Sequence, residues 1–183
     1  MDAKSSVDAP QARPDAKRVS ESTTQLARLM GLADANNAGN VHGGTVMKLA
    51  DEAAGLAAIK HSQRRVVTAA MDRMDFLVPI NVGQLVTFTA TVNAAWRTSM
   101  EVGVRVEAEN VRTGAVQHTN SVYLTMVALD DAGRPAAVPA AIAETTVEQR
   151  RMREAELRRA NRLSERAEIM ASREREDGSD GAG

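Results

Sequence analysis

One apolar segment in the first half of the chain constrains the fold most. Thr45–His61 has the length of a helix, and only Lys48, Asp51, Glu52 and Lys60 interrupt a surface that is otherwise apolar nearly all round. A helix of this kind is typically buried. The rest of the chain must therefore supply elements that wrap around it.

Strand-like segments follow the helix, and the middle two have a clear period of two. We predict strands over Val66–Val78, Leu85–Val92, Met100–Glu107 and Ser121–Leu129, with a short possible strand over Thr24–Met30. A buried helix followed by antiparallel strands predicts an α+β fold. In this arrangement the Thr-rich face of the second strand should meet solvent, and Glu101 and Arg105 of the third should point outward.

The flanking segments set the domain boundaries. We expect a disordered N-terminal arm over residues 1–20, one domain over 21–140, a charged C-terminal helix over 141–170 and a flexible tail over 171–183. The C-terminal helix has opposite charges at helical spacing, which predicts a solvated helix that docks weakly on the body or on a neighbouring subunit. The alternative is an Arg cluster that meets nucleotide phosphates.

Composition excludes several classes of function. The net charge of -1 does not favour nucleic-acid binding, and the absence of cysteine excludes disulfides, thiolate nucleophiles and cysteine metal sites. No apolar run is long enough for a secretory signal or for membrane insertion. We therefore expect a cytoplasmic protein.

Gly43 and Gly44 stand where the apolar helix begins. Glycine lets a ligand approach the backbone closely, and free N–H groups at a helix N-terminus attract negative charge. These two residues therefore predict an oxyanion hole, which is a group of donors that stabilises the anionic intermediate of acyl transfer.

Two carboxylates, Asp51 and Glu52, interrupt the apolar helix. A carboxylate removed from water takes up a proton more readily, as a general base must. Asp51 is the candidate base, and the alternative is that it pairs with a cation such as Lys48. Glu52 is expected to have a structural or supporting role.

Asn40 and His42 flank Val41 just before the glycines, so both side chains could face one cleft. Asn40 could hold a carbonyl or a water, or could be a turn residue. His42 could carry a proton, or could be a hydrogen-bonded structural residue. The three histidines lack the spacing of metal ligands, so we expect no metal.

These residues resemble a known family. Asn40–Gly44, Met47–Gly55, Val66–Ala69, Asp75–Phe76 and Thr98–Val102 are similar to the hotdog-fold acyl-CoA thioesterases, notably the cytosolic (brain-type) acyl-CoA hydrolases and their short bacterial relatives. The similarity runs from about Thr24 to Arg158. It implies a hotdog fold, in which a long central helix is wrapped by an antiparallel sheet, here followed by the charged C-terminal helix.

The resemblance also implies a function and a site. The expected activity is hydrolysis of acyl-CoA to free acid and CoA, with no cofactor because CoA belongs to the substrate. In the implied homodimer, Asn40 of one subunit would face Asp51 of its partner. Enzymes of this family commonly assemble such dimers into trimers of dimers. Arg97, Thr98 and Ser99 resemble the stretch that contacts CoA.

Two other functions stay open at this point. A hotdog enoyl-CoA hydratase or dehydratase would use His42 with Asp51, and a non-catalytic acyl-CoA sensor would bind without turnover. The acyl chain length is also open. Small residues at Ala53, Ala54 and Ala57 could open a tunnel or could simply pack the sheet against the helix.

Overall fold

The computed structural model describes residues 15–72 and 74–180. The chain divides into two compact units, residues 1–142 and residues 143–183. In the described residues, the first unit contains the strands and the long helix α2, and the second contains the single helix α3.

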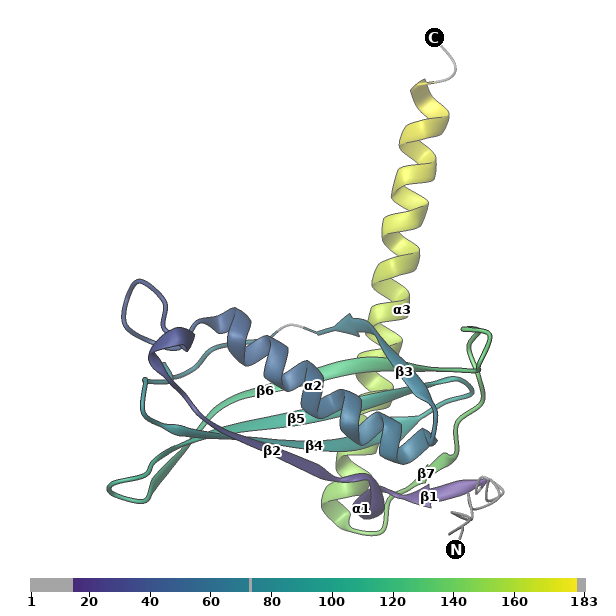
Figure 1. The fold of residues 1–183 in the computed structure, drawn as a ribbon. Coiled ribbons are helices and arrows are strands. Elements are labelled where there is room, and N and C mark those ends of the chain that lie inside the picture. Colours follow the sequence, from purple (N-terminus) through teal and green to yellow (C-terminus); the bar gives the residue numbers. More distant parts are fainter. Residues whose placement is uncertain (1–14, 73, 181–183) are drawn as a thin grey trace, which may run out of the picture. The chain divides into compact units, whose positions relative to one another are not determined.

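A five-stranded sheet forms the frame of the first unit (Figure 1). Its strands lie in the order β2-β4-β5-β6-β3, and every neighbouring pair is antiparallel. β2 and β3 are therefore the edges. The strands are β2 (Thr24–Leu29), β3 (Arg65–Met71), β4 (Leu85–Ala95), β5 (Ser99–Asn110) and β6 (Ala115–Leu129).

Each predicted strand has a counterpart in the sheet, but the first long one was predicted too far. β3 ends at Met71 rather than at Val78, and residues 74–80 contain no regular element. The backbone leaves the ladder after the N–H of Asp72 donates to the carbonyl of Tyr123 at 2.9 Å. Apolar residues continue through Leu77 and Val78, and for this reason periodicity alone did not mark the end.

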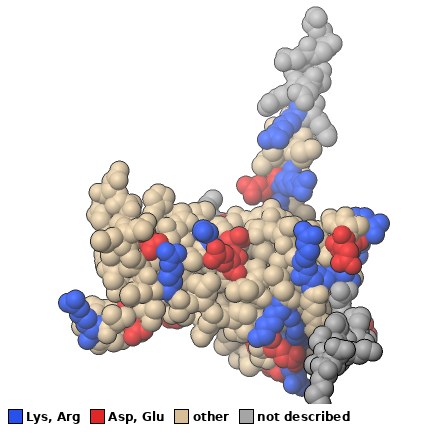
Figure 2. All heavy atoms as spheres, in the orientation of Figure 1, with Lys and Arg blue, Asp and Glu red and all other residues tan. Residues whose placement is uncertain are grey.

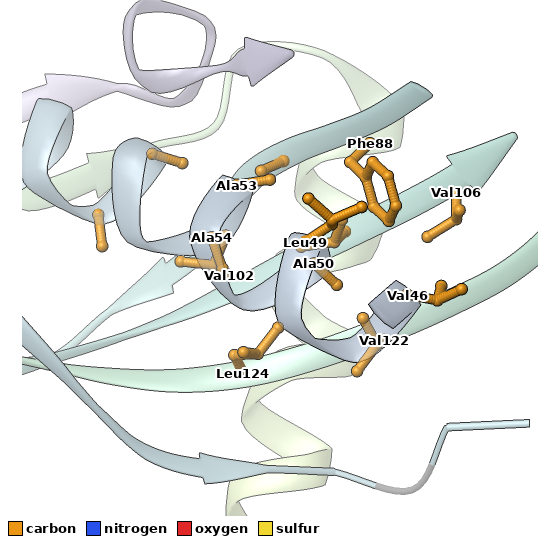
Figure 3. Close-up of a cluster of buried hydrophobic side chains, with 14 of the residues drawn as sticks. Val46, Leu49, Ala50, Ala53, Ala54, Phe88, Val102, Val106, Val122 and Leu124 are labelled. Atoms are coloured by element: carbon orange, nitrogen blue, oxygen red, sulfur yellow. The ribbon is translucent and has the colours of Figure 1, made fainter. Parts of the chain in front are cut away.

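The core lies between the sheet and α2 (Gly43–Ser62), as Figure 3 shows. The period of two places Phe88, Val102 and Leu124 on the helix side of neighbouring strands, where they are buried. The helix meets them largely with alanines that are 0% exposed. These alanines pack the helix against the sheet, which favours packing over a tunnel as the reason for their small size. They are Ala50, Ala53, Ala54, Ala57 and Ala58.

The prediction that α2 is buried all round is wrong for one face. Met47, Leu56 and Ile59 are 40–50% exposed on this helix. A single sheet covers only one side of a helical cylinder, and the described chain supplies no second layer over the other side. The sequence pattern reports that a face is apolar but not what covers it.

The prediction that Glu101 points into solvent is also wrong. Its side chain is 0% exposed, and the Nδ2 of Asn93 donates to its Oε1 at 3.2 Å. Asn93 occupies the space that a Cβ would need at Gly103, where such an atom would lie 2.7 Å from Nδ2. A carboxylate can be buried when hydrogen-bond donors compensate for the loss of water. The alternation of residues along one strand gives no information about a donor on the neighbouring strand.

Part of the predicted N-terminal arm is ordered. Residues 1–14 lie outside the described residues, but Ala16–Arg18 form β1 and Val19–Ser22 form the short helix α1. β1 pairs in parallel with β7 (Ala140–Ile142), and Val19 is 2% exposed. A partner more than a hundred residues away supplies this order, so the local composition did not predict it.

α3 (Thr146–Asp180) is longer than the predicted helix, because residues 171–180 of the expected tail are helical. Its start has a clear local cause. The N–H groups of Glu144 and Thr145 each donate to the Glu148 carboxylate at 2.9 Å, and the Glu148 N–H donates back to the Thr145 hydroxyl. None of the described helices is both long and apolar enough to cross a bilayer.

His61, near the end of α2, ties the helix to both ends of the first unit. It is 0% exposed, and its Nε2 lies 3.1 Å from the carbonyl oxygen of Pro139. A carbonyl can only accept, so Nε2 carries the proton, and the Ser22 hydroxyl donates to Nδ1 at 2.9 Å. Burial is the main reason that the pKa of His61 lies below its ordinary value of 6.5, and the nearby Lys17 lowers the pKa further.

This histidine should make the fold less stable in acid. The unfolded chain binds the proton at the ordinary pKa while the folded chain resists it, so the free energy of unfolding should fall as the pH drops below about 6.5. His61→Gln keeps a donor for Pro139 but does not titrate, and its stability should change less with pH. Urea unfolding between about pH 7.5 and pH 5.5 measures the two slopes. Equal slopes would contradict the prediction.

Candidate active site

A cavity of about 210 Å³ opens beside the first turn of α2. The loop before the helix forms one wall, and the segment after β3 forms the other. The lining residues are Asn36, Asn40, Val41, Gly43, Val46, Phe76, Val78, Pro79 and Ile80. Asn40 and Gly43, which the sequence predicted as site residues, thus line the same cavity.

None of the residues that line this cavity has an ionisable side chain. Within residues 31–45 the one ionisable carboxylate, Asp34, is 6% exposed and is held by Arg28 at 2.8 Å. In Figure 2 the loop before α2, at the upper left of the view, is tan throughout. The lining of the cavity therefore suits an uncharged group such as an acyl chain or a thioester carbonyl.

Asn36 holds the loop and lines the cavity. Its Oδ1 accepts from the N–H groups of Ala38 at 2.9 Å and Asn40 at 3.2 Å, which closes an Asx turn. Because Oδ1 is engaged by the backbone, the orientation of the amide is set, and Nδ2 is left as a donor. The side chain of Asn40 makes no such turn, although its backbone bridges to Asn81.

His42 caps the helix. Its Nδ1 accepts from the Gly44 N–H at 3.0 Å, so this amide is already used inside the protein. A Cβ at Gly44 would lie 3.1 Å from Nδ1, which explains why glycine suits this cap. Gly44 and His42 are therefore placed as partners in helix capping.

Gly43 offers the amide that the cap does not use. Among the described residues its N–H donates to no protein group, and it lines the cavity. The ring of Phe76 lies directly over it, because a Cβ at Gly43 would be 3.2 Å from the ring's Cζ. An N–H at a helix N-terminus, partly shielded by an aromatic ring, is suited to hold an oxyanion.

Asp51 lies outside this cavity, on the half-buried face of α2 next to edge strand β3. The Thr68 hydroxyl of β3 donates to its Oδ1 at 2.5 Å, so the carboxylate has a set orientation. Eight residues separate Asp51 from Gly43, which corresponds to about 12 Å along a helix. Within one chain these two groups cannot act on the same bond.

Glu52 and Lys48 form an exposed ion pair, with nitrogen and oxygen 3.7 Å apart. Asp51 and Glu52 thus have different partners although they are adjacent. Of the two, Asp51 has the better-defined position, because an exposed pair at this separation is only weakly held.

Arg97, Thr98 and Ser99 lie in and beside the turn between β4 and β5. The carbonyls of Arg97 and Thr98 accept from Val138 and Ala128, which holds the turn against the neighbouring chain. The full length of β4, on the order of 30 Å, separates this turn from the start of that strand, where the loop of Asn40 meets the sheet. The structure does not bring these residues to the cavity of their own chain.

Sequence reasoning missed three residues of this region. Asn36 stands in a loop with several asparagines, Thr68 is one residue of a strand, and Phe76 follows an apolar run. Thr68 and Phe76 belong to segments that carry the family resemblance, but the resemblance assigned no role to either residue. In the described ranges, no three His, Cys, Asp or Glu side chains gather closely enough for a metal ion.

Comparison with known proteins defines the class. The family model of the thioesterase superfamily matches residues 38–115. The Helicobacter pylori protein VdlD is 40% identical over 111 residues, which are 61% of this chain and 63% of VdlD. The cytosolic acyl coenzyme A thioester hydrolase of mouse is 35% identical over 147 residues, which are 79% of this chain and 39% of that enzyme.

Solved structures agree with this class. An acyl-CoA hydrolase from Staphylococcus aureus, in complex with butyryl-CoA, CoA and CoA disulfide, is 37% identical with a TM-score of 0.80, covering 86% of this chain and 96% of that one. Variants of that enzyme with an asparagine, an aspartate or a threonine replaced by alanine are also similar. A hexameric acyl-CoA thioesterase is 39% identical with a TM-score of 0.81, covering 83% and 97%.

The chain belongs to the thioesterase superfamily and, within it, to the acyl-CoA thioester hydrolases. This membership confirms the resemblance and the α+β hotdog fold that it implied. The chain spans less than two thirds of the length of VdlD and of the mouse enzyme.

Proposed function

We propose that this protein hydrolyses acyl-CoA to a carboxylic acid and CoA, at sites shared between two subunits. Water adds to the thioester carbonyl, the C–S bond breaks, and the thiolate of CoA leaves. The observation that carries this proposal is the Asp51 carboxylate, oriented by Thr68 and separated from the cavity that its own chain forms.

Spacing along the chain supports the choice of residues. The asparagine, aspartate and threonine replaced in the Staphylococcus aureus hydrolase stand 15 and 17 positions apart. Asn36, Asp51 and Thr68 have the same two spacings here. We therefore assign the polar side-chain donor of the cavity to Asn36 first and keep Asn40 as the second candidate.

The edge of the sheet supports a homodimer. β3 is an edge strand that bears Thr68 and Val67, the latter 46% exposed. Leu56 and Ile59 expose apolar surface on α2. An open edge beside apolar side chains is a surface that proteins usually cover. A second copy that covers it would bring Asp51 of one subunit toward the cavity of the other.

In the proposed mechanism, the thioester carbonyl binds in the cavity with its oxygen toward the Gly43 N–H and the Asn36 Nδ2. Asp51 of the partner subunit takes a proton from a water, which then attacks the carbonyl carbon. The two donors stabilise the charge that develops on oxygen, an effect worth about 2.7–4 kcal/mol per donor in other enzymes. The thiolate needs little help to leave because thiols are acidic.

The other predicted residues have supporting roles in this proposal. His42 and Gly44 hold the start of α2, so that the Gly43 N–H stays directed at the cavity. Arg97, Thr98 and Ser99 would contact the CoA moiety, with Arg97 on a phosphate. The hexameric neighbours support a trimer of dimers, and the cytosolic mouse relative supports a cytoplasmic enzyme.

The test is release of free thiol from acyl-CoA by the full chain, run beside hydration of an enoyl-CoA. Thiol release without hydration is expected, because the Nδ1 of His42 already accepts from the Gly44 N–H and this nitrogen is therefore not available to take a proton from a substrate. Hydration without thiol release would instead favour the hydratase. Tight binding of acyl-CoA with no turnover would make the protein a sensor and end the hydrolase proposal.

A further inference from the structure

The cavity beside α2 has an apolar wall that the chemistry of hydrolysis does not use. Beyond its two asparagines and Gly43, the lining is apolar and includes Val46, Phe76 and Ile80. The volume of about 210 Å³ lies below the ~300–1,000 Å³ of pockets that hold drug-sized ligands. The space that one chain supplies therefore fits a short acyl chain better than a long one.

We propose that this wall is the acyl pocket, that the Phe76 ring limits the length of the chain it accepts, and that the enzyme prefers short acyl groups. This inference rests on the proposed function. An acyl group whose carbonyl oxygen lies at the Gly43 N–H must pass this ring, because the ring's Cζ lies 3.2 Å from the Cβ position of Gly43.

Phe76 also stands where the cavity meets solvent. It is 49% exposed although it lines the cavity, so one part of the ring closes the pocket while the other faces water. Removing the ring would extend the pocket outward without disturbing the core, since Phe76 is not part of the buried cluster. A long acyl chain would then lie on surface that the ring now occupies.

A buried asparagine keeps this ring in place. Asn120 of β6 is 0% exposed, and its Nδ2 donates to the carbonyl of Asp75 at 2.9 Å, one peptide before Phe76. In the residue after Phe76, the Leu77 N–H donates to the carbonyl of Thr119 at 3.4 Å. Among the described residues, the Oδ1 of Asn120 has no hydrogen-bond partner. A buried unpaired oxygen destabilises the fold, so the presence of an amide at this position needs a reason, and the hydrogen bond from its Nδ2 to the Asp75 carbonyl supplies one. Asn120 is therefore a positioning residue.

The experiment compares kcat/KM for acetyl-, butyryl-, hexanoyl-, octanoyl- and lauroyl-CoA. For the wild type, kcat/KM should fall from butyryl- to lauroyl-CoA. Each methylene that gains apolar burial improves binding by about fourfold, so Phe76→Ala should raise the lauroyl/butyryl ratio by about tenfold or more. Phe76→Trp should lower the octanoyl/butyryl ratio. Leu77→Ala, 69% exposed and outside the lining, is the matched control and should leave the ratios unchanged.

Asn120→Leu tests the positioning role. Loss of the hold on Asp75 should raise KM for butyryl-CoA and flatten the dependence on chain length, while kcat changes little. A merely structural role would lower the melting temperature and leave the length profile as in the wild type. The latter result would remove Asn120 from the proposal.

A series of S-alkyl-CoA thioethers separates this inference from the proposed function, because these compounds bind but cannot be hydrolysed. If the wild type cleaves no thioester, the proposed function fails, yet calorimetry with the thioethers still reports the pocket. Affinity that depends on alkyl length, with an optimum that Phe76→Ala moves to longer chains, supports the pocket. The pocket is overturned if the thioethers do not bind or if their affinity is independent of alkyl length. It is also overturned if Phe76→Ala changes the affinity equally at every length.

Discussion

Asp51→Asn should lower kcat for acyl-CoA hydrolysis by about 10²–10⁴-fold, the usual worth of a general base. Asparagine has the shape of aspartate and can still accept from the Thr68 hydroxyl, which now donates to Oδ1 at 2.5 Å. The substitution therefore removes the base and little else. Initial rates of thiol release at saturating substrate measure the loss, and circular dichroism checks the fold.

Two neighbouring substitutions bracket this result. Glu52→Gln changes the adjacent carboxylate, which is exposed and paired with Lys48, and should leave the rate unchanged. Thr68→Val removes the hydroxyl that orients Asp51, and a lost hydrogen bond to a charged group should cost about 10–100-fold. If Asp51→Asn kept a rate within a few-fold of the wild type, or Glu52→Gln matched its loss, the base would have been assigned wrongly.

Mixing two inactive variants should restore activity if the site spans two subunits. Asn36→Asp keeps an oxygen for the turn to Ala38 and Asn40 but loses the Nδ2 donor. A dimer of one Asn36→Asp subunit and one Asp51→Asn subunit contains one intact site and one with both changes. Random pairing of equal amounts should therefore recover about a quarter of the wild-type rate, since each partner uses the same surface.

Co-expression of the two variants gives the mixture, and each variant alone is the baseline. A rate no higher than these baselines would show that Asn36 and Asp51 do not form a site across subunits. The same pairing with Asn40→Ala tests the second candidate. If Asn40→Ala alone is inactive and complements Asp51→Asn while Asn36→Asp stays active, Asn40 is the donor of the cavity.

Local patterns in the sequence predicted the elements that lie on the core. Alternation along β4 and β5 identified the face that meets α2, because successive side chains of a strand point to opposite sides. The alanines of α2 marked the contact, although they could equally have been interpreted as a tunnel. Gly43, Asp51 and the family resemblance then indicated the function, since each depends on residues close together in the chain.

Burial and contacts between distant segments were decided by the tertiary structure. Glu101 was predicted to face water and is fully buried beside Asn93. The α2 face that bears Leu56 was predicted to be covered and is half exposed. Periodicity reports which side chains share a face, but the free energy of burying that face depends on what is packed against it.

The sequence by itself determined a helix on an antiparallel sheet and the chemistry available at the start of that helix. Only the fold decided that Asn36 lines the cavity, that Thr68 orients Asp51 and that Phe76 covers Gly43. Each of these three depends on backbone geometry or on a partner from another element. Such partners are set by packing of the whole domain, which no short segment of the chain encodes.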